Sequence, residues 1–177
     1  MNTQSSRASE IAAYSATELM HDGRPVEIRA LRPNDEADLL AAVEKTSAQS
    51  LYRRFFGVRR GFSEQEISFF VNVDFVNHVA LVAVSNEGGR SEIVGGGRFI
   101  VVSPSRAEMA FAVIDRCQGQ GIGSALLRHL VRIAQENSIR ELVADVLPDN
   151  KPMLKLFEKN GFSAKREGEV VHVVKPL

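Results

Sequence analysis

The chain has 177 residues, and its 22 Lys and Arg residues balance 22 Asp and Glu residues. This length suffices for one domain with a substantial core and is short for two. The zero net charge argues against nucleic acid and against an acidic membrane as partners. The single cysteine, Cys117, excludes an internal disulfide and suits a reducing compartment. Without a membrane-length apolar run or a signal-like N-terminus, the sequence predicts a cytoplasmic protein.

The N-terminal residues differ in composition from the rest of the chain. Residues 1–22 are rich in Ser, Ala, Thr and Glu, which predicts a flexible arm or a loosely docked short helix. Residues 23–177 contain no repeat or linker, so we expect them to form one domain. Its first strand is expected at residues 26–31, where apolar residues alternate with charged ones.

Three short helices are expected after this strand, at residues 34–44, 48–56 and 63–72. Asn34 follows Pro33 and has a side chain suited to capping the first of them. Ser63 and Glu66 have the spacing of a capping box, which predicts the start of the third.

The second half of the chain predicts a mixed sheet. Three extended segments with short links, at residues 78–85, 92–102 and 106–114, are typical of an antiparallel meander. The glycines of the second segment predict a bend or a bulge. A later helix has one apolar face, made of Ile122, Leu126, Leu130 and Ile133. With a strand at 141–147 it predicts a right-handed parallel crossover, followed by a helix at 150–160 and strands at 162–165 and 170–174. The expected fold is one α/β (α+β) domain.

The stretch from Phe111 to Leu127, FAVIDRCQGQGIGSALL, passes from a strand through a glycine turn into this helix. Gly119, Gly121 and Gly123 allow a tight turn and the close approach of a ligand. The first amides of the helix have no partner within it and, with the helix dipole, suit a diphosphate. No Lys-Ser or Lys-Thr follows the glycines, which excludes a P-loop, and the preceding meander argues against a dinucleotide fold. The stretch therefore predicts a phosphate-bearing cofactor.

Two motifs make the chain, from Val26 to Val174, resemble the GNAT superfamily of N-acetyltransferases. The first is Gln/Arg-x-x-Gly-x-Gly/Ala, present as Gln118, Gly121 and Gly123. The second lies in LPDNKPMLKLFEKNGF and supplies Asn150, Met153, Leu156, Phe157, Glu158, Lys159, Gly161 and Phe162. The resemblance implies a mostly antiparallel sheet with helices on both faces and a central parallel strand pair that splays at the cofactor site.

The resemblance also implies acetyl-CoA as the co-substrate and no metal. The pyrophosphate is expected on the amides of the glycine turn, and the pantetheine arm along the preceding strand. For Phe157, a core position at helical spacing is an equally good interpretation. The expected cofactor-binding residues are Phe111, Ala112, Val113, Gln118, Gly119, Gln120, Gly121, Ile122, Gly123, Ser124, Asn150 and Phe157.

An amine acceptor needs a base, because a lysine side chain has a pKa of about 10.4 and arrives protonated. Glu108 is the candidate catalytic residue, since it lies on the strand before the glycine turn and related lysine acetyltransferases carry their catalytic Glu there. The alternative is a rim carboxylate paired with Arg98 or Arg106. Asp145, on the parallel strand, is the reserve base, with a buried structural role as its own alternative.

The residue at position 157 departs from the family pattern. Many members place a Tyr there, which protonates the departing thiolate, and Phe157 has no proton to donate. We therefore expect direct attack in a ternary complex without a dedicated acid. Cys117 leaves a covalent acetyl-Cys route open, although a free cysteine more often only packs.

The runs SLYRRFFGVRR (50–60) and RAEMAFAV (106–113) narrow the resemblance to the catalytic domain of bacterial protein lysine acetyltransferases, which act on AMP-forming acyl-CoA synthetases. The expected acceptor is therefore a protein lysine. A small amine or amino acid is the second candidate, and a catalytically weak acetyl-CoA sensor is the third. The helical spacing of Leu51, Phe55 and Phe56 favours a core-facing stripe with a solvated basic edge, whose arginines would meet an acidic protein surface. The sequence does not distinguish between a monomer and a homodimer.

Overall fold

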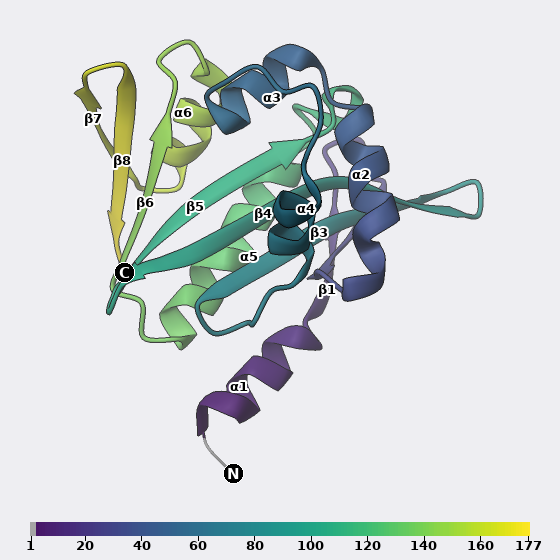
Figure 1. The fold of residues 1–177 in the computed structure, drawn as a ribbon, viewed down its shortest axis with the longest axis horizontal. Helices are drawn as coiled ribbons and strands as arrows, with labels where there is room; N and C mark the ends of the chain where they lie inside the picture. Colours follow the sequence, from purple (N-terminus) through teal and green to yellow (C-terminus); the bar gives the residue numbers. More distant parts are fainter. Residues whose placement is uncertain (1–2) are drawn as a thin grey trace.

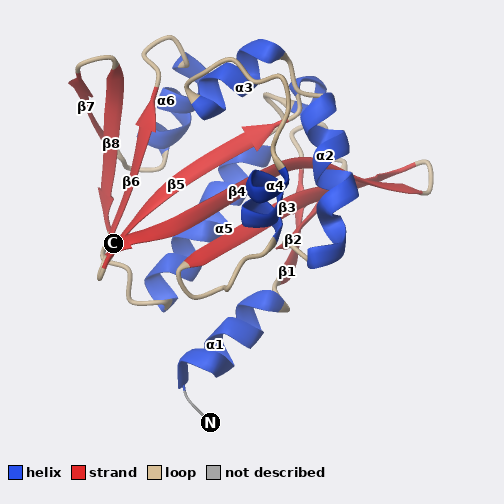
Figure 2. Ribbon diagram, in the orientation of Figure 1, coloured by secondary structure: helices blue, strands red, loops and turns tan. Residues whose placement is uncertain are grey.

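The computed structural model describes residues 3–177, which form six α-helices and one eight-stranded sheet (Figures 1 and 2). The helices are α1 (Thr3–Ala12), α2 (Glu36–Glu44), α3 (Ala48–Phe55), α4 (Glu64–Val71), α5 (Ile122–Glu136) and α6 (Lys151–Lys159), with 3-10 turns η1 (Pro33–Asp35) and η2 (Asp115–Cys117). The strands are β1 (Ser15–Leu19), β2 (Pro25–Ala30), β3 (His78–Glu87), β4 (Arg90–Ser103), β5 (Arg106–Val113), β6 (Glu141–Val146), β7 (Ser163–Glu167) and β8 (Val170–Pro176). Within the described residues, no helix has the length and apolar character needed to cross a bilayer.

The strand order is β1-β2-β3-β4-β5-β6-β8-β7, and every neighbouring pair is antiparallel except β5 and β6. The expected mixed, mostly antiparallel sheet with one parallel crossover is therefore confirmed. Helix α5 lies behind the sheet in Figure 1, whereas α2 and α4 lie in front of it. The sheet thus has a helix layer on each face.

The core forms mainly between α5 and the sheet. The predicted apolar face of α5 is buried at all four positions, and full burial of such side chains contributes about 1.5–3 kcal/mol each. The glycines of β4 leave room for the side chains packed between the sheet and α5, because a Cβ on Gly97 would lie 2.6 Å from the Phe111 ring of β5. The pairing of β3 with β4 shifts register between Ala83 and Val84, opposite the start of the glycine run. The predicted bulge is confirmed.

Two predicted helix starts are confirmed in detail. Ser63 and Glu66 form a complete capping box at α4, each side chain accepting from the other residue's backbone N–H. At α6 the cap is Asn150, whose side chain accepts from the Met153 N–H. Gly161 ends the same helix at a φ of 81°, in the left-handed region that glycine favours.

The start of α2 differs from the prediction. Residues 33–35 form a 3-10 turn, and Asp35 rather than Asn34 precedes the first residue of the helix. Asp35 is buried and accepts hydrogen bonds from both terminal nitrogens of Arg29, at 2.7 and 2.8 Å. Burial opposes ionisation of Asp35, but the Arg29 guanidinium and the Arg32 N–H outweigh it and lower its pKa. The ion pair with β2, which local capping rules do not include, therefore sets the helix start.

Residues 1–22 are expected to form a flexible arm or a loosely docked short helix, and the described part contains a short helix followed by a strand that the sequence does not predict. The first two residues lie outside the described part, α1 follows, and β1 pairs with β2 along its whole length. The Glu18 carboxylate is 3.0 Å from Arg128 Nη2 and 2.8 Å from His129 Nε2, and Tyr14 bonds the other nitrogen of His129. Strand β1 is held by main-chain pairing and by these polar contacts with α5, and it does not need an apolar face. Its sequence therefore lacks the alternation of apolar and polar residues that predicts a strand.

Candidate active site

A cleft opens where β5 and β6 separate. The two strands pair only through residues 106–108 and 141–143. Beyond that point β5 pairs with β4 alone and β6 with β8 alone, so the facing edges diverge. The resulting cleft has a volume of about 420 Å³ and reaches from Glu108 to the glycine turn. The expected splayed parallel pair is present.

The glycine turn closes one end of this cleft. Gly119 and Gly121 have φ values of 75° and 88°, which residues with a side chain rarely adopt. A Cβ on Gly119 would have no neighbour within 4 Å, so this residue leaves its side of the turn open. A Cβ on Gly123 would lie 2.9 Å from Leu156, so that glycine lets α6 approach α5. The first amides of α5 therefore face the cleft as an anion site can require.

Gln118 fixes the turn to the elements around it. Its Nε2 donates to the Val113 carbonyl at 3.0 Å and to Ser50 Oγ at 3.2 Å. The side chain thus joins the end of β5 to α3, across the mouth of the cleft. Nearby, the Asp115 carboxylate accepts from the Ser47 N–H at 2.9 Å, a second link between η2 and α3.

Glu108 lies on the wall of the cleft, exposed, on the face of β5 opposite the buried Met109. Neither arginine considered as its partner pairs with it. Arg106 is 2.5 Å from Glu141, and Arg98 donates to the Phe70 carbonyl and to His78 Nε2 at 3.2 and 2.9 Å. The alternative of a carboxylate paired with either arginine is therefore wrong.

Asp145 lies across the cleft from β5, on β6. It is exposed, and its carboxylate is 2.8 Å from His172 Nδ1. The expectation that this carboxylate is buried is wrong, because Asp145 lines the open cleft, where His172 of β8 is its partner. Glu108 remains the carboxylate of the cleft without an ion-pair partner among residues 3–177.

Two arginines set the electrostatics around Glu108. Burial lowers the pKa of Arg54 to about 10, although the Glu108 carboxylate opposes this shift. Burial, with a smaller effect of the nearby Arg54, lowers the pKa of Arg98 to about 9. Both guanidinium groups stay charged at neutral pH. A positive charge, that of Arg54, therefore lies near the Glu108 carboxylate.

The wall formed by α6 is apolar near the strands and basic farther out. Phe157 is 2% exposed and packs edge-on against Phe111 and Phe162, with ring centroids 6.0 and 4.8 Å away. It also lines the cleft, so the core and the cofactor-facing interpretations are compatible. Lys155 and Lys159, one turn apart, line the outer part.

The structure brings nearly all predicted site residues together. Those that line the one cleft are Glu108, Phe111, Ala112, Val113, Gln118, Gly119, Gly121, Ile122, Gly123, Ser124, Asn150 and Phe157. Gln120 does not line it, and its Oε1 is buried without a hydrogen-bond partner in the described part of the chain. Cys117 lies at the base of the turn, 4% exposed. No group of three His, Cys, Asp or Glu side chains suited to a metal occurs within residues 3–177.

Sequence reasoning missed several residues of the cleft. His21 belongs to the segment predicted as an arm, and Phe56 was placed in a core-facing stripe although it is 46% exposed. The basic pair Lys155 and Lys159 was visible in the α6 motif, where its spacing of four residues puts both on one helix face. Nothing in the sequence around His21 indicates its position.

The model of the Acetyltransferase (GNAT) family matches residues 45–162, more than half of the chain. The chain belongs to this family. Members of the GNAT family use acetyl-CoA as the acyl donor.

Relatives of this GNAT acetyltransferase include whole proteins and single domains. It is 29% identical to Acetyltransferase PA5475 of Pseudomonas aeruginosa over 92% of this chain and 89% of that protein. It is 32% identical to Acetyltransferase Pat of Mycolicibacterium smegmatis over 79% of this chain and 42% of that longer protein. The crystal structure of the GNAT domain of S. lividans PAT superposes with a TM-score of 0.86 and 33% identity, covering 92% of this chain and 97% of that one. The chain is thus similar to the catalytic part of the PAT proteins.

Proposed function

We propose that this GNAT acetyltransferase moves the acetyl group of acetyl-CoA to the side-chain amine of a lysine in a protein, with Glu108 as general base. The observation that carries the proposal is the position of the Glu108 carboxylate. It lies on the cleft wall beside the point where β5 and β6 part, and neither Arg98 nor Arg106 holds it. The similarity to Pat and to the S. lividans PAT domain favours a protein acceptor, and we propose an AMP-forming acyl-CoA synthetase.

The residues of the cleft fit acetyl-CoA. The amides that open α5 suit its diphosphate, and Lys155 and Lys159 add positive charge on the outer wall. The edge of β5 beyond Glu108 has no strand partner, so its main-chain groups are available to the amides of the pantetheine arm. Asn150 and Phe157 would flank the arm from α6.

Glu108 would take the proton that the ammonium group must lose before attack. The neutral amine then forms a C–N bond to the thioester carbonyl, the C–S bond breaks, and coenzyme A leaves as the thiolate, while the amide nitrogen gives its surplus proton to solvent. Arg54 and Arg98 favour the neutral amine, because positive charges nearby disfavour the ammonium form. Phe157 supplies no proton to the thiolate, so we propose that solvent does. Cys117 is buried in η2, which argues against an acetyl-Cys route.

The rim of the cleft formed by α3 supports a protein acceptor. Phe56 lines the cleft with Glu108 and is 46% exposed, and Val58, two residues later, is 80% exposed. Arg53 pairs with Asp149 and Arg59 with Glu66, whereas Arg60 is exposed and has no ion pair with residues 3–177. Such a rim suits a lysine with a long aliphatic stem on a surface that carries acidic residues.

The test is thiol release from acetyl-CoA with and without a purified AMP-forming acyl-CoA synthetase, followed by mass spectrometry of the acceptor. We expect synthetase-dependent release and an acetylated lysine. Release with free amines or amino acids but not with the synthetase would favour a small acceptor. Tight binding of acetyl-CoA without release to any amine would favour a sensor and contradict the proposal.

A further inference from the structure

We infer that His21 positions the glycine turn for the diphosphate of coenzyme A by holding two of its carbonyl groups. The inference rests on acetyl-CoA as co-substrate and not on the identity of the acceptor. His21 lies in the turn between β1 and β2, outside residues 45–162 that match the family model. The family pattern therefore assigns it no part in the site.

His21 contacts three successive residues of the glycine turn. Its backbone N–H donates to the Gln120 carbonyl at 3.0 Å, and its Nδ1 lies 3.0 Å from the Gly119 carbonyl oxygen. Because a carbonyl only accepts, Nδ1 must carry the proton in this contact. The ring also covers Gly121, where a Cβ would lie 2.8 Å from Nε2. One residue of the N-terminal segment thus packs along the whole turn.

The two carbonyl contacts determine where the neighbouring amides point. In a planar trans peptide the C=O and the following N–H lie on opposite sides. With the Gly119 and Gln120 carbonyls directed at His21, the N–H groups of Gln120 and Gly121 point the opposite way. Neither amide has a hydrogen-bond acceptor among residues 3–177, so both are available to an anion. His21 therefore aligns these donors before the ligand arrives.

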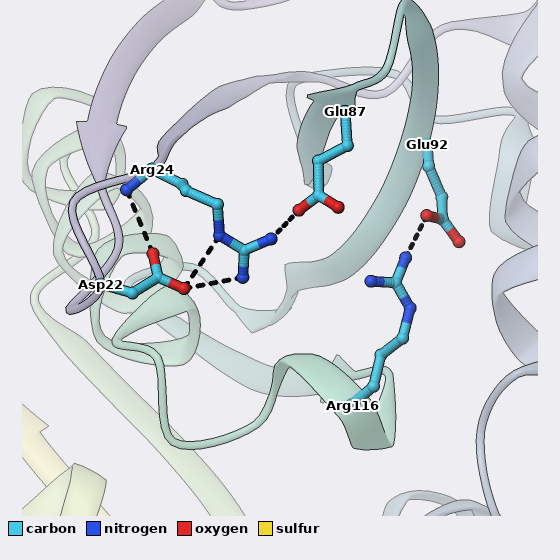
Figure 3. A network of polar contacts seen from close by, with 5 residues as sticks. All are labelled: Asp22, Arg24, Glu87, Glu92 and Arg116. Carbon is cyan, nitrogen blue, oxygen red and sulfur yellow. Dashed lines mark hydrogen bonds and ion pairs between the residues drawn. The ribbon is translucent and has the colours of Figure 1, made fainter.

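The segment that carries His21 is itself anchored. The Arg24 guanidinium binds Asp22, with 2.7 Å between Nη2 and Oδ2, and reaches Glu87 at the end of β3 (Figure 3). Across the same β3–β4 hairpin, Arg116 of η2 pairs with Glu92 (Figure 3). The β1–β2 turn and η2, which meet at the glycine turn, are therefore both bound to the β3–β4 hairpin.

Strand β1 is also fixed to the helix that begins at the turn. Glu18 binds Arg128 and His129 of α5, so β1 and α5 form one unit. His21 acts as a positioning residue at the end of this unit, and its loss should not disturb the fold. The prediction is that the turn loses affinity for the diphosphate while the chemistry at Glu108 continues.

The experiment compares His21→Ala, His21→Asn and His21→Gln by calorimetric binding of acetyl-CoA, which needs no acceptor. The Asn amide nitrogen can replace Nδ1 and reach the Gly119 carbonyl, whereas the longer Gln side chain places its nitrogen nearer Nε2. We expect Kd to rise about tenfold for the Ala variant, the upper range for one hydrogen bond, and to recover in the Asn variant. The melting temperature should stay within a few degrees of the unsubstituted protein.

Three results would overturn the inference. A Kd within about twofold of the unsubstituted protein for His21→Ala would show that the turn needs no such support. Recovery by Gln and not by Asn would indicate a direct contact of Nε2 with phosphate in place of positioning through the carbonyl. With an active acceptor in hand, KM for acetyl-CoA should rise while kcat stays near its original value; a fall in kcat alone would also contradict positioning.

Discussion

The side of the cleft proposed for the cofactor and the side proposed for the acceptor differ in the groups that they offer a ligand. The cofactor side consists mainly of backbone: the glycine turn, the first amides of α5 and the open edge of β5. The acceptor side consists of side chains, among them Arg54 and Phe56 of the α3 region and Glu108. Backbone sites require glycines at set places, which a sequence displays. A site made of side chains depends on which helix packs over the sheet, and this packing is difficult to predict from the sequence.

The same contrast appears in the backbone conformations. On the cofactor side the left-handed positions are glycines, whereas on the acceptor side Phe56 has a φ of 55°. Phe75 has the same φ but packs against the core, which offsets the strain. Phe56 is nearly half exposed, so the fold gains little from its ring. Phe56 ends α3 in this conformation, and we propose that its exposed ring contacts the acceptor.

The largest effect is expected for Glu108→Gln, which removes the proposed base. Turnover should fall roughly 100-fold or more, the usual contribution of a general base, while calorimetry shows an unchanged Kd for acetyl-CoA. Asp145→Asn is the matched control, because Asp145 is bound to His172, and it should change turnover little. Equal losses in the two variants would mean that Glu108 has no special role.

A smaller effect is expected for Gly121→Ala on the cofactor side. The new Cβ would be held at a φ of 88° and lie 2.8 Å from His21, so the turn must shift. We expect Kd for acetyl-CoA to rise about tenfold, which corresponds to strain of about 1.4 kcal/mol. Gly88→Ala, with a φ of 59° and open space around it in the β3–β4 hairpin, should lower stability without changing Kd. If both variants bind normally, the turn does not hold the diphosphate.

Phe56→Gly tests the acceptor side and should change activity and stability in opposite directions. Glycine relieves the left-handed strain, so the free energy of unfolding should hold or rise by up to about 1 kcal/mol. The loss of the apolar ring should raise KM for a protein acceptor roughly fivefold, without affecting that for acetyl-CoA. Phe75→Gly removes a packed ring at the same φ and should lower the unfolding free energy. A less stable Phe56→Gly variant with normal acceptor kinetics would assign the ring a structural role.

The smallest effect at neutral pH is expected from His78 of β3, which makes stability depend on pH. Burial, with a contribution from Arg98 and against Asp74, lowers the pKa of His78 from 6.5 to about 4. The folded state then binds fewer protons than the unfolded state, so stability is complete above about pH 6.5 and decreases toward pH 4. Urea unfolding across this range should show the decrease, and His78→Gln should reduce it. A His78→Gln profile that matches the original would indicate that other groups titrate.

Local rules predicted the elements whose ends are set locally. Ser63 with Glu66, Asn150 and the glycines of the turn each act within a few residues of the chain, and the structure shows them as expected. The fold class followed from the order of extended and helical segments. The candidate site was also largely predictable, because its cofactor side follows the chain from β5 into α5.

The misses share a different cause, which is contact between segments far apart in the chain. Strand β1 is polar and forms through pairing with β2 and through Glu18 on α5. Asp35 replaces Asn34 before α2 because Arg29 of β2 holds it. His21 reaches the glycine turn only once β1 is in place. None of these contacts leaves a periodic pattern in the sequence.

The short pairing of β5 with β6 makes the sheet two panels joined at one corner. Strands β1–β5 form one panel and β6–β8 the other, and three residue pairs connect their main chains. A pantetheine arm along β5 would fill the gap as a guest strand, so the ligand would complete the sheet that the chain leaves open. Free coenzyme A has the same arm and diphosphate as its acetylated form. We therefore expect free coenzyme A to stabilise the two panels nearly as well as acetyl-CoA does. Its release should then limit the rate at which the next acetyl-CoA binds.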